Sequence, residues 1–174
     1  MKTNIVLFGF MGVGKSEAGR ILGEKLGMTF TDLDEEIVEK AGKSIEAIFE
    51  DDGEATFRDL ERAIINEAVV REGQIIACGG GAVLDEVNLR NLRRSSKMIL
   101  LTADPYTILN RVGSIGGPRP LLHVGDRLER IKELLSARNP LYLEAADFRI
   151  DTSHRTPEQV AQEIIRLLEG SGER

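Results

Sequence analysis

The stretch Gly9-Phe10-Met11-Gly12-Val13-Gly14-Lys15-Ser16 decides how the rest of the sequence is interpreted. It fits the pattern G-x-x-x-x-G-K-[ST], in which glycines let several backbone N–H groups curl around one bound phosphate. The lysine brings a positive charge to the β- and γ-phosphates, and the serine hydroxyl can ligate Mg²⁺. A glycine-rich turn that binds nothing is the less favoured alternative. We therefore expect a nucleoside triphosphate to bind at residues 9–16.

The residues on either side of this phosphate loop support the same interpretation. Residues 5–8 form a continuous apolar run, which predicts a buried strand directly before the loop. After the loop, apolar residues recur at helical spacing as far as Gly27, which is a helix stop signal. A phosphate loop requires the order strand, loop and helix, because the helix N-terminus adds its own positive field.

The rest of the chain alternates between strand and helix patterns. Further strands are expected at residues 28–31, 74–78, 98–101 and 148–151. Helices are expected at about residues 37–41, 45–49, 54–72 and 85–94, from about 104, at 126–135 with an interruption near Pro140, and from Thr156-Pro157 to a frayed tail at Gly170. This alternation predicts an α/β fold with a parallel sheet covered on both faces.

Composition limits the class of protein. The chain has 174 residues, of which 41% are apolar and 30% are charged, so a single globular domain is expected. The net charge of −6 argues against nucleic acid or an anionic membrane as a partner. Cys78 is the only cysteine, and no apolar run approaches the ~20 residues of a membrane span. We expect a cytoplasmic protein, and the small, acidic chain favours a monomer.

Two carboxylates follow the predicted strand at residues 28–31. Asp32 and Asp34 would lie at the carboxyl edge of the sheet, where open α/β sheets bind ligands. One of them can hold Mg²⁺ through its water shell, and the other can orient an acceptor hydroxyl and take its proton. The alternative is that one of them only caps the helix that follows.

Two more groups have a functional and a purely structural interpretation. Arg58 and Glu61 share one face of the predicted helix at 54–72, where they can also be an ordinary surface pair. Gly79-Gly80-Gly81 directly follows a strand, so its N–H groups can approach a small substrate or simply form a tight turn.

Residues 112–125 break the helical pattern with four glycines, two prolines and a single arginine. A connection of this length in a compact domain is a candidate lid, and Arg119 can cover the transferring phosphates. Arg138 ends the helix predicted after the lid, where a cation also suits the helix macrodipole.

Taken together, these residues resemble the shikimate kinase family. The matching stretches are Gly9–Ser16, Asp32-Leu33-Asp34, Ser44-Ile45 through Phe49 with Asp52-Gly53-Glu54, Phe57-Arg58 with Glu61, Gly79-Gly80-Gly81-Ala82-Val83, Arg119-Pro120-Leu121-Leu122, and Arg138 with Pro140-Leu141-Tyr142. The resemblance implies a P-loop, nucleoside-monophosphate-kinase-like α/β/α architecture with a five-stranded parallel sheet. It also implies one domain over residues 1–174, a substrate-binding region at about 32–62 and a lid at about 112–125.

The same resemblance implies an activity and a role for each matched residue. The family transfers the γ-phosphate of ATP to the 3-hydroxyl of shikimate, with Mg²⁺, in the pathway to chorismate and the aromatic amino acids. The implied catalytic residues are Lys15, Asp34 and Arg119, and the implied metal-binding residues are Ser16 and Asp32. The implied ATP-binding residues are Gly12, Val13, Gly14, Lys15, Ser16, Glu17, Arg111, Arg119 and Arg155. The implied shikimate-binding residues are Asp34, Arg58, Glu61, Gly79, Gly80, Gly81 and Arg138, with Glu61 orienting Arg58.

One position departs from the family pattern, and other functions stay open. Glu17 stands where the family usually has a second hydroxyl residue, and an acid beside the phosphates opposes ATP binding. A gluconate-type or nucleoside monophosphate kinase is the nearest rival, although a substrate without a carboxylate would not need both Arg58 and Arg138. A GTP-dependent switch should carry Asn-Lys-x-Asp, and the sequence has no Asn-Lys pair. An ATP-dependent switch is not excluded by the sequence.

Overall fold

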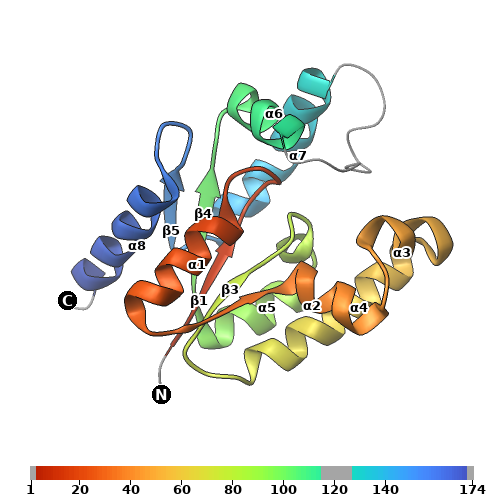
Figure 1. The fold of residues 1–174 in the computed structure, drawn as a ribbon, viewed down its shortest axis with the longest axis horizontal. Coiled ribbons are helices and arrows are strands. Elements are labelled where there is room, and N and C mark those ends of the chain that lie inside the picture. The colour runs from red at the N-terminus through yellow and green to blue at the C-terminus, as the bar shows by residue number, and fades with distance from the viewer. Residues whose placement is uncertain (1–2, 115–126, 172–174) are drawn as a thin grey trace.

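The computed structural model describes residues 3–114 and 127–171, and a five-stranded sheet lies at its centre (Figure 1). The strands are β1 (Asn4–Phe8), β2 (Thr29–Asp32), β3 (Gln74–Ala77), β4 (Ser96–Thr102) and β5 (Phe148–Asp151). All pairings are parallel, and the spatial order is β2-β3-β1-β4-β5. The predicted parallel sheet is confirmed, and the loop after β1 leaves the middle of its carboxyl edge.

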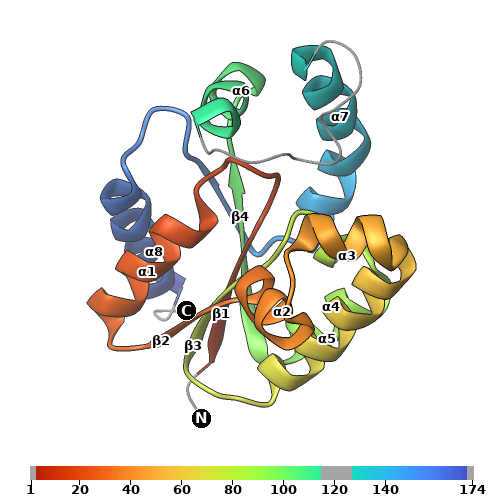
Figure 2. The ribbon, with the colours of Figure 1, turned by 45° about the vertical axis from the view of Figure 1, so that its right-hand side comes forward.

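Helices cover both faces of this sheet. They are α1 (Lys15–Leu26), α2 (Leu33–Ala41), α3 (Ile45–Asp51), α4 (Gly53–Val69), the short 3₁₀ helix η1 (Ala82–Leu84), α5 (Glu86–Ser95), α6 (Pro105–Ser114), α7 (Arg127–Ala145) and α8 (Pro157–Ser171). Figure 2 shows α1 and α8 on one face, and α4 and α5 on the other. The predicted three-layer α/β/α architecture is therefore confirmed.

The central strand is apolar because it is covered on both faces. Every residue of β1 is buried, and its register pairs Ile5 with Ile75 of β3 and Leu7 with Ile99 of β4. A parallel strand in this position has no solvated face, so a continuous apolar run replaces the alternation of a half-exposed strand. This run fixes the direction in which the chain enters the phosphate loop.

Several helix boundaries differ from the sequence prediction, and α2 begins at Leu33 instead of near residue 37. The helix expected to reach residue 72 ends at Val69, because the chain must turn at Gly73, with φ of 70°, to enter β3. The predicted interruption at Pro140 is wrong, since α7 continues to Ala145. Proline removes only the bond to the carbonyl of Ser136, and this exposed residue can turn its carbonyl to water.

The C-terminal helix also extends further than predicted. A frayed tail was expected from Gly170, but α8 includes Gly170 and ends at Ser171. The Ser171 hydroxyl donates a hydrogen bond of 2.8 Å to the carbonyl of Leu168, which satisfies one of the unpaired carbonyls of the last turn. Thr156 begins the helix as expected, since its hydroxyl accepts from the N–H of Gln159.

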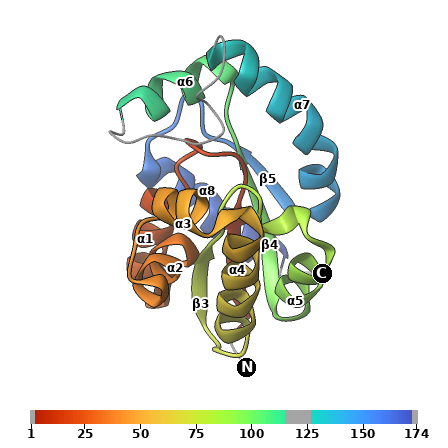
Figure 3. The ribbon, with the colours of Figure 1, turned by 90° about the vertical axis from the view of Figure 1, so that its right-hand side faces the viewer.

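The predicted lid is only partly within the described residues. Residues 112–114 belong to α6, because Val112 is buried against the core instead of entering a loop. Residues 115–125, with Arg119, lie outside the described part of the chain. Figure 3 shows α6 at the carboxyl edge of the sheet, next to the beginning of α7. Among the described helices, none is long and apolar enough to cross a membrane.

Candidate active site

The phosphate loop lies between β1 and α1, and glycines hold it open. Gly9, Gly12 and Gly14 have φ of 139°, 78° and 90°, values that residues with a β-carbon rarely adopt. A β-carbon at Gly9 would also lie 2.2 Å from the carbonyl oxygen of Leu101 in the neighbouring strand β4. The loop can follow this path only with glycine at these positions.

Lys15 brings a positive charge to the loop. Its Nζ donates hydrogen bonds to the carbonyl oxygens of Gly9 at 2.8 Å and Phe10 at 2.9 Å, so the ammonium lies over the loop. Because α1 begins at Lys15, the positive end of the helix macrodipole faces the same point. The loop thus offers an anion both a full charge and a helix N-terminus.

Asp32 fulfils the structural role that was its alternative and also contacts the phosphate loop. Its Oδ1 accepts hydrogen bonds from the N–H groups of Asp34, at 3.0 Å, and Glu35, at 3.4 Å, and thereby caps α2. Its Oδ2 accepts a hydrogen bond from the hydroxyl of Ser16. A serine hydroxyl and a carboxylate therefore meet at the first turn of α1, and these are hard oxygen donors of the kind that Mg²⁺ prefers.

A cavity of about 550 Å³ joins the phosphate loop to the triple-glycine turn. The expected site residues that line it are Gly12, Val13, Gly14, Lys15, Ser16, Glu17, Asp34, Gly79, Gly80, Arg111 and Arg155. Its volume is in the range of small-molecule sites. Asp34 lines the cavity next to Gly79. Five expected site residues are not among its lining residues, namely Asp32, Arg58, Glu61, Gly81 and Arg138.

Three charged side chains converge on Gly79-Gly80-Gly81. A β-carbon at Gly79 would lie 3.0 Å from Asp34 Oδ1, and one at Gly80 would lie 3.3 Å from Arg138 Nη1. A β-carbon at Gly81 would lie 2.7 Å from both terminal nitrogens of Arg58. The absence of side chains at the turn is what gives these three groups room. The structure thus brings together residues of α2, α4, α7 and the β3–α5 connection.

Arg58 pairs with a buried acid as well as with an exposed one. Its Nη1 lies 2.9 Å from Oε1 of Glu61, which is 2% exposed, and its Nη2 lies 3.5 Å from Oε1 of the exposed Glu54. Burial raises the pKa of Glu61, and the positive charge of Arg58 opposes that rise. Because Glu61 is buried, Arg58 and Glu61 are not an ordinary surface pair.

Arg111 braces the phosphate loop through a residue that the sequence analysis missed. Its guanidinium donates to the carbonyl of Gly12 at 3.3 Å and to the hydroxyl and carbonyl of Thr152 at 2.9 and 2.7 Å. The Thr152 hydroxyl in turn donates to the carbonyl of Val13 at 2.9 Å. Thr152 directly follows β5, so its place at the carboxyl edge was a usable signal. Arg155 lies nearby and donates to the carbonyl of Asp151 at 3.3 Å.

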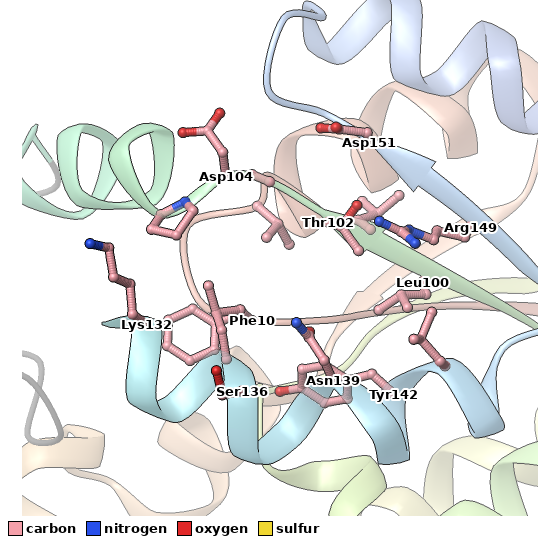
Figure 4. A pocket seen from close by; sticks show the side chains of 16 residues that line it. Phe10, Leu100, Thr102, Asp104, Lys132, Ser136, Asn139, Tyr142, Arg149 and Asp151 are labelled. Atoms are coloured by element: carbon pink, nitrogen blue, oxygen red, sulfur yellow. The ribbon is translucent and has the colours of Figure 1, made fainter. Parts of the chain in front are cut away.

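A second cavity, of about 590 Å³, lies between β4, β5 and α7 (Figure 4). Two of its carboxylates are Asp104 and Asp151, while Asn139 and Tyr142 line it from α7. Hydrogen bonds from the hydroxyl and N–H of Thr107 lower the pKa of Asp104 to about 2. Of the expected site residues that the structure describes, only Val13 lines this cavity, so the first cavity is the better candidate for the active site.

Comparisons with known proteins agree with one another. The family model described as shikimate kinase matches residues 11–169. A shikimate kinase of Thermodesulfovibrio yellowstonii is 45% identical over 166 residues, which are 95% of each chain. One of Symbiobacterium thermophilum is 42% identical over 172 residues, which are 98% of this chain and 99% of that one. The solved structure of the Acinetobacter baumannii shikimate kinase in complex with shikimate matches with a TM-score of 0.94 and 36% identity, covering 100% of this chain and 97% of that one. This chain belongs to the shikimate kinase family.

Proposed function

We propose that this chain transfers the γ-phosphate of ATP to the 3-hydroxyl of shikimate in the cavity that joins the phosphate loop to the triple-glycine turn. Membership of the shikimate kinase family supports this function. The single observation that carries it is the convergence of Arg58 and Arg138 on a turn next to Asp34, at one end of a cavity that contains the phosphate loop. A nucleotide and a small carboxylate thus fit side by side.

At the nucleotide end, the loop would bind the phosphates through its backbone N–H groups and Lys15. The Lys15 ammonium is held by the carbonyls of Gly9 and Phe10, so it is oriented toward the loop. Arg111 would lie beside the nucleotide while bracing Gly12. Arg155 would contact the nucleotide from the edge of the cavity, and Arg119 would cover the phosphates from the lid.

Ser16 and Asp32 fit a magnesium site. Mg²⁺ keeps several of its waters and takes few protein ligands, so one hydroxyl and one carboxylate acting through water suffice beside the phosphates. Within residues 3–114 and 127–171 no group of three or more His, Cys, Asp or Glu side chains could hold a metal ion, and this site does not require one. Bound Mg²⁺ would neutralise charge that develops on the phosphates.

At the acceptor end, Arg58 and Arg138 would bind the carboxylate of shikimate. Each charge-assisted hydrogen bond contributes about 1.5–3 kcal/mol, and a guanidinium can give two to one carboxylate. The ring hydroxyls need a carboxylate and backbone amides, which Asp34 and Gly80 can supply. Because phosphoryl transfer depends mainly on positioning and on charge neutralisation, Asp34 would chiefly orient the 3-hydroxyl and accept its proton.

The test is ADP release from ATP and Mg²⁺, measured with shikimate, gluconate or a nucleoside monophosphate as the acceptor. Stimulation by shikimate alone is the expected result. Stimulation by a nucleoside monophosphate, which has no carboxylate, would keep the phosphate-loop kinase and refute the carboxylate clamp. Stimulation by gluconate, which has one, would keep the clamp and refute shikimate as the acceptor, while no stimulation by any acceptor would refute the proposed transfer. Sedimentation of the same sample tests our further proposal that the enzyme acts as a monomer.

A further inference from the structure

Tyr142 is the buried residue that most directly links the acceptor site to the core. It lies one turn after Arg138 on α7, and residues spaced by four share one face of a helix. Tyr142 is 1% exposed, and its ring packs edge to face on Phe8 of β1, with 6.0 Å between centroids and 72° between planes. Its hydroxyl donates a hydrogen bond to the carbonyl of Gly80.

The carbonyls of the triple glycine show why this bond matters. The carbonyl of Gly79 accepts from the N–H of Ala82 at 3.1 Å, and that of Gly81 accepts from the N–H of Leu84 at 3.2 Å. These two bonds close the turn that leads into η1. The carbonyl of Gly80 is bonded from outside the turn, by a residue 62 positions away in the sequence. Tyr142 therefore supplies the partner that the local turn does not give to Gly80.

The substrate arginine lies beside the same phenolic oxygen. A β-carbon at Gly80 would lie 3.3 Å from Arg138 Nη1 and 3.6 Å from the Tyr142 oxygen, and the Arg138 guanidinium lies over the ring of Phe10 at 5.6 Å from the centroid. A phenol can donate one hydrogen bond and accept another, so the two contacts are compatible. Burial raises the pKa of Tyr142, which keeps the hydroxyl protonated as a donor to Gly80.

We propose that Tyr142 is a positioning residue for the acceptor, whose hydroxyl fixes the separation and orientation of Gly80 and Arg138. This inference rests on the proposed function. The peptide that joins Gly80 to Gly81 is planar, so fixing the Gly80 carbonyl toward α7 turns the Gly81 N–H away from α7. One oxygen thus sets a backbone donor and a guanidinium of the same site, although Tyr142 itself contacts no reacting atom.

The experiment compares Tyr142→Phe with Tyr106→Phe. The chain has two tyrosines, and Tyr106 is 62% exposed on α6, so the control removes the same atom from the surface. Phenylalanine keeps the packing on Phe8. We expect Tyr142→Phe to raise the KM for shikimate about tenfold, as the loss of an ordinary hydrogen bond to a charged or backbone group does, while the KM for ATP changes less than about twofold. Tyr106→Phe should change neither.

A double-mutant cycle separates positioning from general support of the fold. If Tyr142 acts through Arg138, the Tyr142→Phe change should raise the KM for shikimate much less in an Arg138→Ala background than in the wild type. Equal effects in both backgrounds, an equal rise in both KM values, or no rise in the KM for shikimate would overturn the proposal. Loss of the folded circular dichroism spectrum in Tyr142→Phe would assign the hydroxyl to stability and overturn it too.

A spectroscopic measurement completes the test. The chain has no tryptophan, so in Tyr106→Phe protein Tyr142 is the only tyrosine that emits. Shikimate without ATP should change this emission, because Arg138 shifts between the phenol and the substrate carboxylate. An emission that stays constant while shikimate binds would overturn the proposal. Wild-type enzyme that shows no shikimate-stimulated ADP release would instead refute the proposed function, so the two failures are distinguishable.

Discussion

The two ends of the cavity are built in different ways. The nucleotide end is one contiguous segment, residues 9–16, whose shape depends on glycine φ angles and whose donors are largely backbone groups. The acceptor end is assembled from α2, α4, α7 and the turn after β3, and it depends on charged side chains that meet at three glycines. A single substitution should therefore have different consequences at the two ends.

The difference follows from how each end carries its charge. At the phosphate loop, a helix terminus and several backbone amides face the phosphates, and Lys15 adds a full positive charge from within the loop. At the acceptor end, each guanidinium has its own neighbours: Arg58 hydrogen-bonds to Glu61, and Arg138 lies over the ring of Phe10 beside Tyr142. Removing Lys15 from the nucleotide end should therefore lower kcat, whereas removing an arginine from the acceptor end should weaken the binding of shikimate alone.

The largest effect is expected for Lys15→Ala. Removing a charge aimed at the transferring phosphate should lower kcat about a thousandfold, in line with the loss of other preorganised donors. The fold should persist, because Lys15 is only partly buried and its ammonium bonds to the carbonyls of Gly9 and Phe10 within the loop itself. Turnover at saturating ATP measures kcat, and a thermal melt of the same variant tests whether the fold persists. Retained activity with an unchanged melt would contradict the role of the loop.

Arg58→Ala should have the next largest effect, and it should be selective. Loss of a forked, charge-assisted contact to the carboxylate should raise the KM for shikimate by about 10- to 100-fold and leave the KM for ATP nearly unchanged. Arg62→Ala is the matched control, because Arg62 lies on the same helix but pairs with Asp85 and Asp59. If both KM values rise together in Arg58→Ala, then Arg58 supports the fold and the clamp is refuted.

The same contrast decides what could be predicted from the sequence. The phosphate loop, the strand before it and the helix after it were predictable because their signals lie within about thirty neighbouring residues. Asp32 was harder, since it both caps α2 and bonds to Ser16, and a sequence offers these as alternatives. In the folded protein, one oxygen of the Asp32 carboxylate caps α2 and the other bonds to Ser16, so both interactions form at once.

Apart from the carboxylate pair Asp32 and Asp34, the acceptor end was predictable only through the resemblance to a family. From spacing alone, Gly79-Gly80-Gly81 could equally be a substrate-binding turn or a simple tight turn. The charged side chains that meet it come from residues far away in the chain. Local rules also failed at Pro140, because burial of Tyr142 and Ala145 in the following turn stabilises α7 beyond the proline. The hydrogen bond from Thr152 to the loop was missed because its partner, Val13, lies far away in the sequence.

Shikimate binding at the acceptor end should depend on pH through Glu61, and Glu61→Gln should remove that dependence. Burial raises the pKa of Glu61 above its ordinary value, so a falling pH protonates it earlier than an exposed glutamate and weakens its hold on Arg58. The KM for shikimate should therefore rise as the pH falls through this raised pKa. Because the folded pKa lies above the unfolded one, the free energy of unfolding should gain from Glu61 protonation over the same window.

The measurement is the KM for shikimate as a function of pH in wild type and Glu61→Gln. The glutamine variant should have a KM raised several-fold, by about 1 kcal/mol, and should lack the acid-side rise that belongs to Glu61. Titration of the shikimate carboxylate is common to both proteins and cancels in their ratio. A ratio that does not change with pH would refute the titration of Glu61 as the cause.

The smallest effect is expected for Glu17→Thr, which restores the hydroxyl residue usual in the family at the nucleotide end. Glu17 is exposed in the first turn of α1, where an acid favours the helix macrodipole but repels the phosphates. Removing it should lower the KM for ATP about two- to fivefold and cost about 0.3–1 kcal/mol of stability. Since the effects on the KM for ATP and on stability both act through solvent, they should shrink together as salt is raised.

Glu24→Thr, two turns further along the same helix, provides the control for charge far from the loop. An equal drop in the KM for ATP in that control would mean that net charge, and not the acid beside the phosphates, sets the affinity for ATP.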